Sequence, residues 1–184
     1  TAPAERQQAY RDALQAALRL GCERLARGDA AVDVCEAIVV LFENDPHFNA
    51  GKGAVFNEKG EHELDAAIMD GSTLRCGAVA GVRTVKSPIQ LARLVMEKTR
   101  HVLLMGDGAE QFATLMGVER VPNTYFDTEA RRRVLDEVLR ERAEQEKAQK
   151  GAFVAPRRPQ WTYGTVGCVV REQRGLVADR RRRV

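Results

Sequence analysis

A short apolar run near the end of the chain, Val166 to Val170, is the feature that most constrains the fold. The run reads Val-Gly-Cys-Val-Val, and Tyr163-Gly164-Thr165 precedes it. A continuous apolar run of this kind is typical of a strand that is buried on both faces. We therefore predict that the strand starting at Thr165 lies centrally in a sheet that other layers cover on both sides.

Two explanations fit the Gly164-Thr165 pair at the start of this strand. The first is structural, because Gly precedes strands for steric reasons and Thr is a good strand former. The second is chemical: the Thr165 hydroxyl attacks the carbonyl carbon of Gly164, the peptide becomes an ester, and water releases Thr165 as a new N-terminus. The free α-amine of that threonine, with a reference pKa of about 8, can then take the proton of its hydroxyl. Gly164 lacks a Cβ and so suits the strained backbone that such an attack requires.

Four upstream segments favour the chemical explanation. They are Phe48-Asn49-Ala50-Gly51-Lys52-Gly53-Ala54-Val55, the stretch from His62 to Gly71, Gly77-Ala78-Val79-Ala80-Gly81-Val82, and the stretch from Leu91 to Lys98. Together with Gly164-Thr165-Val166-Gly167, and in that order, they resemble the plant-type L-asparaginase and isoaspartyl peptidase family of N-terminal-nucleophile hydrolases over nearly the whole chain. The related glycosylasparaginases and threonine aspartases typically carry Asp before the nucleophile, so Gly164 favours the asparaginase and isoaspartyl peptidase branch.

The resemblance implies an α+β fold, the αββα four-layer sandwich of N-terminal-nucleophile hydrolases. It also implies autocatalytic cleavage between Gly164 and Thr165, after which Thr165 hydrolyses L-asparagine and β-aspartyl dipeptides without a catalytic cofactor. The implied partners are these small substrates and the protein's own β-subunit, in a dimer of αβ units. Asn49 is expected near the nucleophile, because the family places this asparagine close to the catalytic threonine. The alternative for Asn49 is an ordinary turn residue.

The loop from Phe42 to Gly53 is a candidate site for a structural sodium ion. Pro46, two glycines and an asparagine make a turn of the kind that leaves backbone carbonyls pointing inward without a ladder partner. Either water or a hard cation can satisfy such oxygens. In the resembled family this loop binds sodium through main-chain carbonyls. On this sequence they would be those of Phe42, Glu43, Asp45, Phe48, Ala50 and Lys52.

Length and composition indicate one cytoplasmic domain. The 184 residues suffice for one compact core, and the net charge of +3 is too small to indicate a nucleic-acid partner. No apolar run approaches the ~20 residues that span a bilayer, so no membrane partner is expected. The four cysteines are widely spaced without a CxxC pair, which favours reduced core thiols and the cytosol over disulfides or zinc. The three histidines show no metal-ligand spacing.

Periodicity and turn signals predict alternating helices and strands. An amphipathic helix over 4–27 should bury Tyr10, Leu14, Leu18 and Leu25. Asp29 should cap the next helix, Ser87-Pro88 should start another, and Asp107 with Glu110 should form a capping box. The predicted strands are 53–57, 61–70, 76–83 and 102–105, and a long charged helix should run from 127 to about 150.

The resemblance divides the chain into a domain body over 1–150, a flexible linker over 151–164 that leads to the cleavage site, and the start of the β-subunit over 165–184. The family's His-Gly-Gly-Ala-Gly strand would precede Thr1, and Arg183, within an arginine run, stands where a second threonine is expected. The sandwich is therefore expected to be incomplete at both ends, and the chain as given to be inactive on asparagine. The alternative is a non-enzymatic form that acts as a partner subunit and carries a basic arginine tail.

Overall fold

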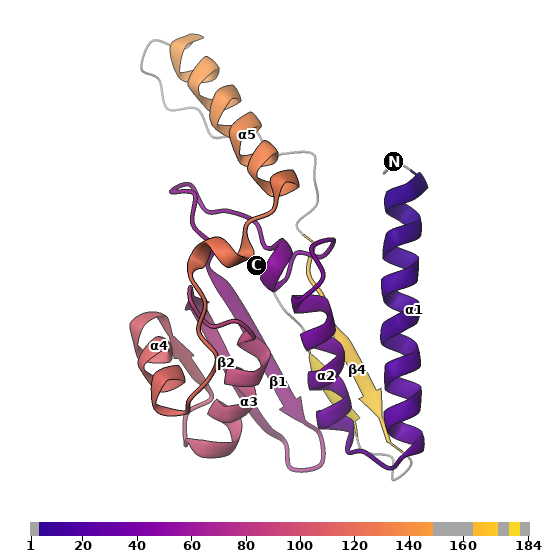
Figure 1. The fold of residues 1–184 in the computed structure, drawn as a ribbon. Coiled ribbons are helices and arrows are strands. Elements are labelled where there is room, and N and C mark those ends of the chain that lie inside the picture. The colour runs from indigo at the N-terminus through magenta and orange to yellow at the C-terminus, as the bar shows by residue number, and fades with distance from the viewer. Residues whose placement is uncertain (1–3, 149–163, 173–176, 181–184) are drawn as a thin grey trace.

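The computed structural model describes residues 4–148, 164–172 and 177–180, and for 146–148 and 177–180 it describes only the backbone. These residues form a sheet with strand order β3-β2-β1-β5-β4, with helices packed beside it and one long helix projecting away from it (Figure 1). The strands are β1 (Leu64–Asp70), β2 (Arg75–Val82), β3 (Leu103–Met105), β4 (Cys168–Arg171) and β5 (Val177–Arg180). The helices are α1 (Ala4–Ala26), α2 (Ala31–Glu43), α3 (Pro88–Lys98), α4 (Gly106–Leu115) and α5 (Glu129–Ala148), with short 3-10 turns η1 (Gly51–Gly53) and η2 (Asn123–Phe126).

One face of the sheet forms the main core. β1 and β2 pair antiparallel, and alternate residues such as Leu64, Ile68 and Val79 pack against α3. The approach of α3 is so close that a Cβ on Gly77 would lie 2.2 Å from the carbonyl oxygen of Ala92. The small residues of this strand therefore let a helix pack directly on the backbone.

The described helices leave the opposite face of the sheet uncovered. Pairing places Leu103 and Met105 of β3 on the same face as Ala78 and Ala80 of β2, and Val169 of β4 lies on that face too. Leu103, Met105 and Val169 are 50%, 67% and 65% exposed. Helices α2 and α3 cover the first face only, so the described residues make a layer of helices on a sheet and not four layers. The mixture of helices and a sheet confirms the predicted α+β class.

Strand β4 corrects the prediction of a central strand. It begins at Cys168, lies at one edge of the described sheet and exposes Val169. Val166 and Val170 are buried against α2, so the apolar run has one covered face in this chain. The run is continuous in the sequence, but successive residues of a strand point to opposite faces. Among the described residues, only the face that carries Val166 and Val170 is covered.

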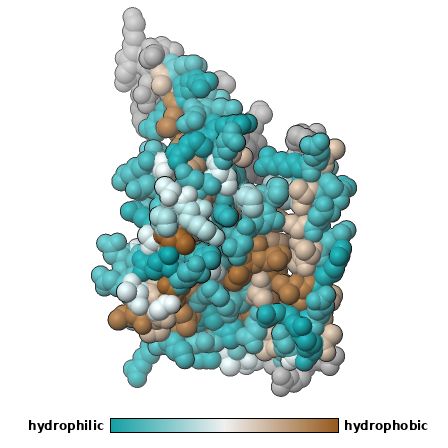
Figure 2. All heavy atoms as spheres, viewed as in Figure 1, coloured by the Kyte–Doolittle hydropathy of each residue, from teal (hydrophilic) through white to brown (hydrophobic). Residues whose placement is uncertain are grey.

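Helix α1 packs on α2 through small residues. Ala17 and Gly21 are the buried residues of α1, and a Cβ on Gly21 would already lie 3.0 Å from the Cδ1 atom of Ile38. Leu14 and Leu18, which the periodicity placed in the core, are 52% and 67% exposed. Hydrophobic side chains are visible at the surface where α1 lies beside α2 (Figure 2). At this close helix crossing the small residues Ala17 and Gly21 are buried, and the larger Leu14 and Leu18 remain exposed.

Several predicted elements have different boundaries or caps. Residues 53–57 are not a strand, and the N-cap of α2 is Ala30, while Asp29 pairs with Arg24 at 3.6 Å. The N-cap of α4 is Met105, so no Asp107 capping box forms. The predicted ranges overlap the observed ones for strands β1, β2 and β3 and for helix α5. Residues 151–163 of the predicted linker over 151–164, and the arginines at 181–183, lie outside the described residues. No helix in the described ranges has the length and apolar character needed to cross a membrane.

Helix α3 starts at Ser87-Pro88 as predicted, but a remote carboxylate satisfies its first turn. Glu43, at the end of α2, is 2% exposed and accepts hydrogen bonds from the Ser87 hydroxyl at 2.5 Å and from the Ile89 N–H at 3.1 Å. An acidic group at this position compensates the unpaired N–H groups of a helix N-terminus. Glu43 thereby joins α2 to α3 next to the loop that follows α2.

Glu110 makes the stability of the fold sensitive to acid. Burial raises the pKa of its carboxyl, but the Thr84 hydroxyl, the N–H groups of Arg83 and Thr84, and the Arg120 cation outweigh burial and hold the pKa below its ordinary value of 4.5. A carboxyl with a lowered folded-state pKa stabilises the fold fully at higher pH and loses that contribution as the pH falls through the folded-state value.

We expect Glu110→Gln to flatten the acid side of the stability curve. Below about pH 4.5 the wild-type free energy of unfolding should fall more steeply than that of the variant, because the variant has no proton to take up at this position. Urea unfolding between pH 3 and 7, on the order of ten points, would measure both slopes. Glu137→Gln, at an exposed position of α5, is the matched control. Parallel slopes for Glu110→Gln and wild type would contradict the prediction.

Candidate active site

Asn49 joins the loop after α2 to the predicted cleavage site. Its side chain is buried, at 6% exposure, and its Nδ2 donates a hydrogen bond to the carbonyl oxygen of Gly164 at 2.6 Å. Its Oδ1 accepts from the N–H of Val55 at 3.0 Å. The structure therefore brings together two of the residues that the sequence selected, although 115 positions separate them.

Aromatic packing fixes the loop that carries Asn49. The ring of Phe48 lies 5.5 Å from that of Tyr10 on α1 and 4.7 Å from that of Phe42 on α2. The Tyr10 hydroxyl also donates to the carbonyl oxygen of His47 at 2.8 Å. These contacts hold the residues just before Asn49 against both helices, so its side chain has one available direction.

Gly164 and Thr165 are both exposed to solvent in the intact chain. The backbone of Gly164 is not left-handed, and a Cβ built on it would meet only the Cβ of Asn49, at 4.0 Å. The expected backbone strain is therefore absent from this conformation, and alanine would fit at Gly164. The feature that distinguishes the site is its hydrogen bond and not its backbone angle.

The contact from Asn49 has a direct chemical consequence. When a nucleophile attacks the carbonyl carbon of Gly164, negative charge develops on the oxygen that Asn49 already holds. A hydrogen-bond donor placed on such an oxygen beforehand stabilises the transition state without reorganisation. The arrangement is therefore suited to cleavage of the bond between Gly164 and Thr165.

The loop proposed to hold sodium is folded tightly around two glycines. Gly51 has a φ of +49°, and a Cβ on it would lie 2.3 Å from the Glu43 carbonyl oxygen. A Cβ on Gly53 would lie 2.1 Å from the Phe48 oxygen and 2.6 Å from the Pro46 oxygen. Carbonyl oxygens thus gather on the inside of the turn, as oxygen coordination of a hard cation requires.

The described residues contain no cluster of three or more His, Cys, Asp or Glu side chains that could hold a metal ion. Three of the six proposed carbonyls also accept backbone hydrogen bonds: Phe42 from Asp45, Asp45 from Phe48, and Ala50 from Gly53, at 3.2 to 3.3 Å. A carbonyl oxygen has two lone pairs, so these bonds are compatible with a cation ligand. The residues present therefore fit a sodium ion bound by main-chain oxygens.

Comparison with known proteins places the site in a family. A sequence profile of the asparaginases matches residues 1–179. The chain belongs to the asparaginase family. The matched range includes Asn49, Gly164 and Thr165.

Relatives of this asparaginase-family chain are named as peptidases and amidases. The isoaspartyl peptidase/L-asparaginase of Mus musculus is 44% identical over 177 residues, which cover 95% of this chain and 51% of that protein. The isoaspartyl peptidase of Salmonella typhimurium is 45% identical over 174 residues, covering 95% and 54%. The probable isoaspartyl peptidase/L-asparaginase 2 of Arabidopsis thaliana is 50% identical over 127 residues, covering 69% and 39%. The chain spans about half the length of these curated relatives.

Sequence reasoning missed one polar cluster of this asparaginase-family chain. His62 was treated as a scattered histidine, yet it is fully buried and bonded to Asp127, 65 positions away. Arg131 was treated as part of a solvated helix, yet its Nε donates to the Gly53 carbonyl oxygen at 2.7 Å. No motif spacing links these residues, so only the fold could reveal that they meet beside the Asn49 loop.

Proposed function

We propose that this protein is a hydrolase of L-asparagine and β-aspartyl dipeptides that becomes active by cleaving itself between Gly164 and Thr165. The observation that carries the proposal is the hydrogen bond from Asn49 to the Gly164 carbonyl oxygen at 2.6 Å. Membership of the asparaginase family and the names of the relatives support the reaction class.

The cleavage step uses groups of this chain. The Thr165 Oγ forms a bond to the Gly164 carbonyl carbon, and the bond from that carbon to the Thr165 nitrogen breaks. The hydroxyl proton passes to the departing nitrogen, which becomes the free α-amine, and Asn49 stabilises the oxygen of Gly164 throughout. Water then hydrolyses the ester and leaves a Gly164 carboxylate and an N-terminal Thr165 with a free hydroxyl.

The same hydroxyl would perform substrate hydrolysis. The α-amine of Thr165 takes the proton as the hydroxyl attacks the side-chain amide carbon of asparagine, or the β-aspartyl peptide carbon. The first product is ammonia or the released amino acid, and the second is an aspartyl ester on Thr165 that water hydrolyses. The amine is available for this role only after cleavage, so self-cleavage must precede substrate hydrolysis.

The face of the sheet that the described helices leave uncovered supports a larger assembly. Leu103, Met105 and Val169 expose apolar surface on one side, and the chain spans about half the length of its relatives. We propose that the remaining length characteristic of the family supplies the second sheet of the four-layer sandwich, with β4 then inside it. In this arrangement the cleaved protein consists of α- and β-subunits that pair into a dimer of αβ units.

The further proposals concern sodium and location. A structural sodium ion would be held by the main-chain oxygens of the loop after α2, where it would fix the turn that presents Asn49 and would take no part in the chemistry. We place the protein in the cytoplasm because its four cysteines are widely spaced in the sequence and include no CxxC pair. A catalytic cofactor has no role in this proposal.

Mass spectrometry of the purified protein tests the proposed function. Residues 1–184 and a version that carries the family's remaining length would be incubated and weighed in parallel, with ammonia release from L-asparagine measured on the same samples. Cleavage of the longer version into two chains, the second beginning at Thr165, together with ammonia release, is the expected result. A longer version that stays intact and inactive would contradict the proposal and favour a non-enzymatic partner subunit.

A further inference from the structure

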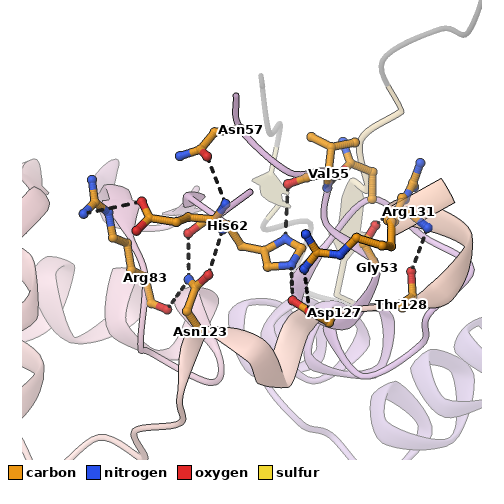
Figure 3. A network of polar contacts seen from close by, with 12 residues as sticks. Gly53, Val55, Asn57, His62, Arg83, Asn123, Asp127, Thr128 and Arg131 are labelled. Carbon is orange, nitrogen blue, oxygen red and sulfur yellow. Dashed lines mark hydrogen bonds and ion pairs between the residues drawn. The ribbon is translucent and has the colours of Figure 1, made fainter. Parts of the chain in front are cut away.

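The segment Gly53–Val55 is held by side chains in place of a neighbouring strand. The Gly53 carbonyl oxygen accepts from Arg131 at 2.7 Å, and the Val55 carbonyl oxygen lies 3.2 Å from the Nδ1 atom of His62. The Val55 N–H donates in turn to Asn49. Backbone groups of a buried segment must find partners, and here they come from α5 and from the start of the β1 hairpin (Figure 3).

His62 stands between two acceptors. Its Nδ1 faces the Val55 carbonyl oxygen, and its Nε2 lies 3.0 Å from the Oδ1 atom of Asp127. The two ring nitrogens of His62 thus contact one backbone carbonyl oxygen and one carboxylate oxygen. The ring is fully buried and lies 4.1 Å from the ring of Phe56, measured between centroids.

Neighbouring residues fix both His62 and its partner. The Asn123 side chain accepts from the His62 N–H and donates to the His62 carbonyl oxygen, each at 2.9 Å. Arg132 donates to the second carboxylate oxygen of Asp127 at 2.9 Å and covers the outer face of Phe56 at 4.0 Å. Asn123 thus holds the backbone of His62 and Arg132 holds the Asp127 carboxylate, and turning the imidazole would break its contacts with Val55 and Asp127 (Figure 3).

The polarity of the Asn49 amide completes the argument. The amide has one oxygen and one NH₂ group, and a donor on its oxygen directs its NH₂ group the other way. Because the Val55 N–H holds the oxygen, the NH₂ group is left to donate to the Gly164 carbonyl. A flipped amide would bring two oxygens together at Gly164 and lose the donor.

We propose that His62, fixed by Asp127, is a positioning residue for the cleavage site. By holding the Val55 carbonyl, His62 keeps the Val55 N–H on Asn49 and so keeps the Asn49 donor on Gly164. The inference rests on the proposed function, because it assigns His62 a role in the same self-cleavage. Arg131 holds the other end of the segment, at Gly53, in the same way.

Hydrogen exchange tests the first link without requiring cleavage. In a Thr165→Ala background, so that the chain stays intact, His62→Gln should speed exchange of the Val55 N–H about tenfold and shift the side-chain NH₂ resonances of Asn49. The amides of α3 should be unaffected. His101→Gln, at an exposed histidine, is the matched control. Unchanged Val55 exchange and unchanged Asn49 resonances in His62→Gln would overturn the inference.

Asp127→Ala covers the case in which His62→Gln does not fold, because the Asp127 side chain is one-third exposed, at 34%. It should speed Val55 exchange in the same direction, whereas Asp136→Ala on the exposed side of α5 should not. Exchange at Val55 that is the same in both aspartate variants would count against the link from Asp127 through His62.

A double-mutant cycle on the cleavage rate tests the second link. We expect His62→Gln to slow cleavage about tenfold and Asn49→Ala about a hundredfold, while the double variant is no slower than Asn49→Ala alone. Fully additive losses would show that His62 acts by another route. If no form cleaves, the proposed function fails, and the exchange measurements still decide whether His62 positions Asn49.

Discussion

Thr165→Ala, made in the version that carries the family's remaining length, is expected to stay a single chain and to release no ammonia from L-asparagine. Both losses follow from one atom, because the proposed cleavage and the proposed hydrolysis use the same Oγ. Mass spectrometry measures the first loss and an ammonia assay the second. No other substitution in the chain should remove both reactions completely while leaving the fold intact.

Thr165→Ser is the matched control for this prediction. It keeps a hydroxyl at the same position, so both reactions should continue at a reduced rate. The Thr165 side chain is exposed in the intact chain, and neither substitution should change the free energy of unfolding by more than about 0.5 kcal/mol. Ammonia release by Thr165→Ala at the wild-type rate would place the nucleophile elsewhere.

Asn49→Ala is expected to slow self-cleavage about a hundredfold or more. The variant removes the donor on the Gly164 carbonyl oxygen, and loss of one preorganised donor of this kind costs about 3 kcal/mol of transition-state stabilisation. The measurement is the fraction of cleaved chain against time by mass spectrometry. Asn49→Asp removes the donor while keeping the size of the side chain, so it should be comparably slow.

Asn57→Ala provides the control for a turn asparagine without a catalytic contact. The Asn57 side chain accepts from the N–H groups of Lys59 and Glu61 in the turn before β1. Its replacement should lower stability by about 1 kcal/mol and leave the cleavage rate per folded molecule unchanged. Equal cleavage rates for Asn49→Ala and Asn57→Ala would return Asn49 to the role of an ordinary turn residue.

Local sequence signals predicted the elements whose stabilising contacts are also local. Ser87-Pro88 marked the start of α3, and the predicted strands 61–70 and 76–83 form the β1–β2 hairpin. The prediction was wrong where a distant residue decided the outcome. Residues 53–57 had the composition of a strand, but Arg131 and His62 satisfy their carbonyls, so no ladder forms.

The residues of the candidate site also differ in whether the sequence could predict them. Asn49, Gly164 and Thr165 were accessible to sequence reasoning because they lie in segments that resemble a family. The position of β4 in the sheet could not be predicted from the sequence. An apolar run such as Val166 to Val170 does not indicate whether its second face will be covered. His62 also lies in a segment that resembles the family, but its role was inaccessible because a buried histidine is identified by its partners, and no spacing rule links it to Asp127 and Val55.

The crowding around Gly51 and Gly53 bears on how tolerance to substitution should be interpreted in this protein. Every other amino acid at Gly53 would collide with backbone oxygens, and at Gly51 it would meet both a collision and an unfavourable φ. A saturation library scored for activity would therefore rank these glycines beside Thr165, although neither takes part in the proposed chemistry. Scoring the same library for abundance as well would separate the two classes, since glycine variants would disappear from the folded pool and Thr165 variants would remain in it.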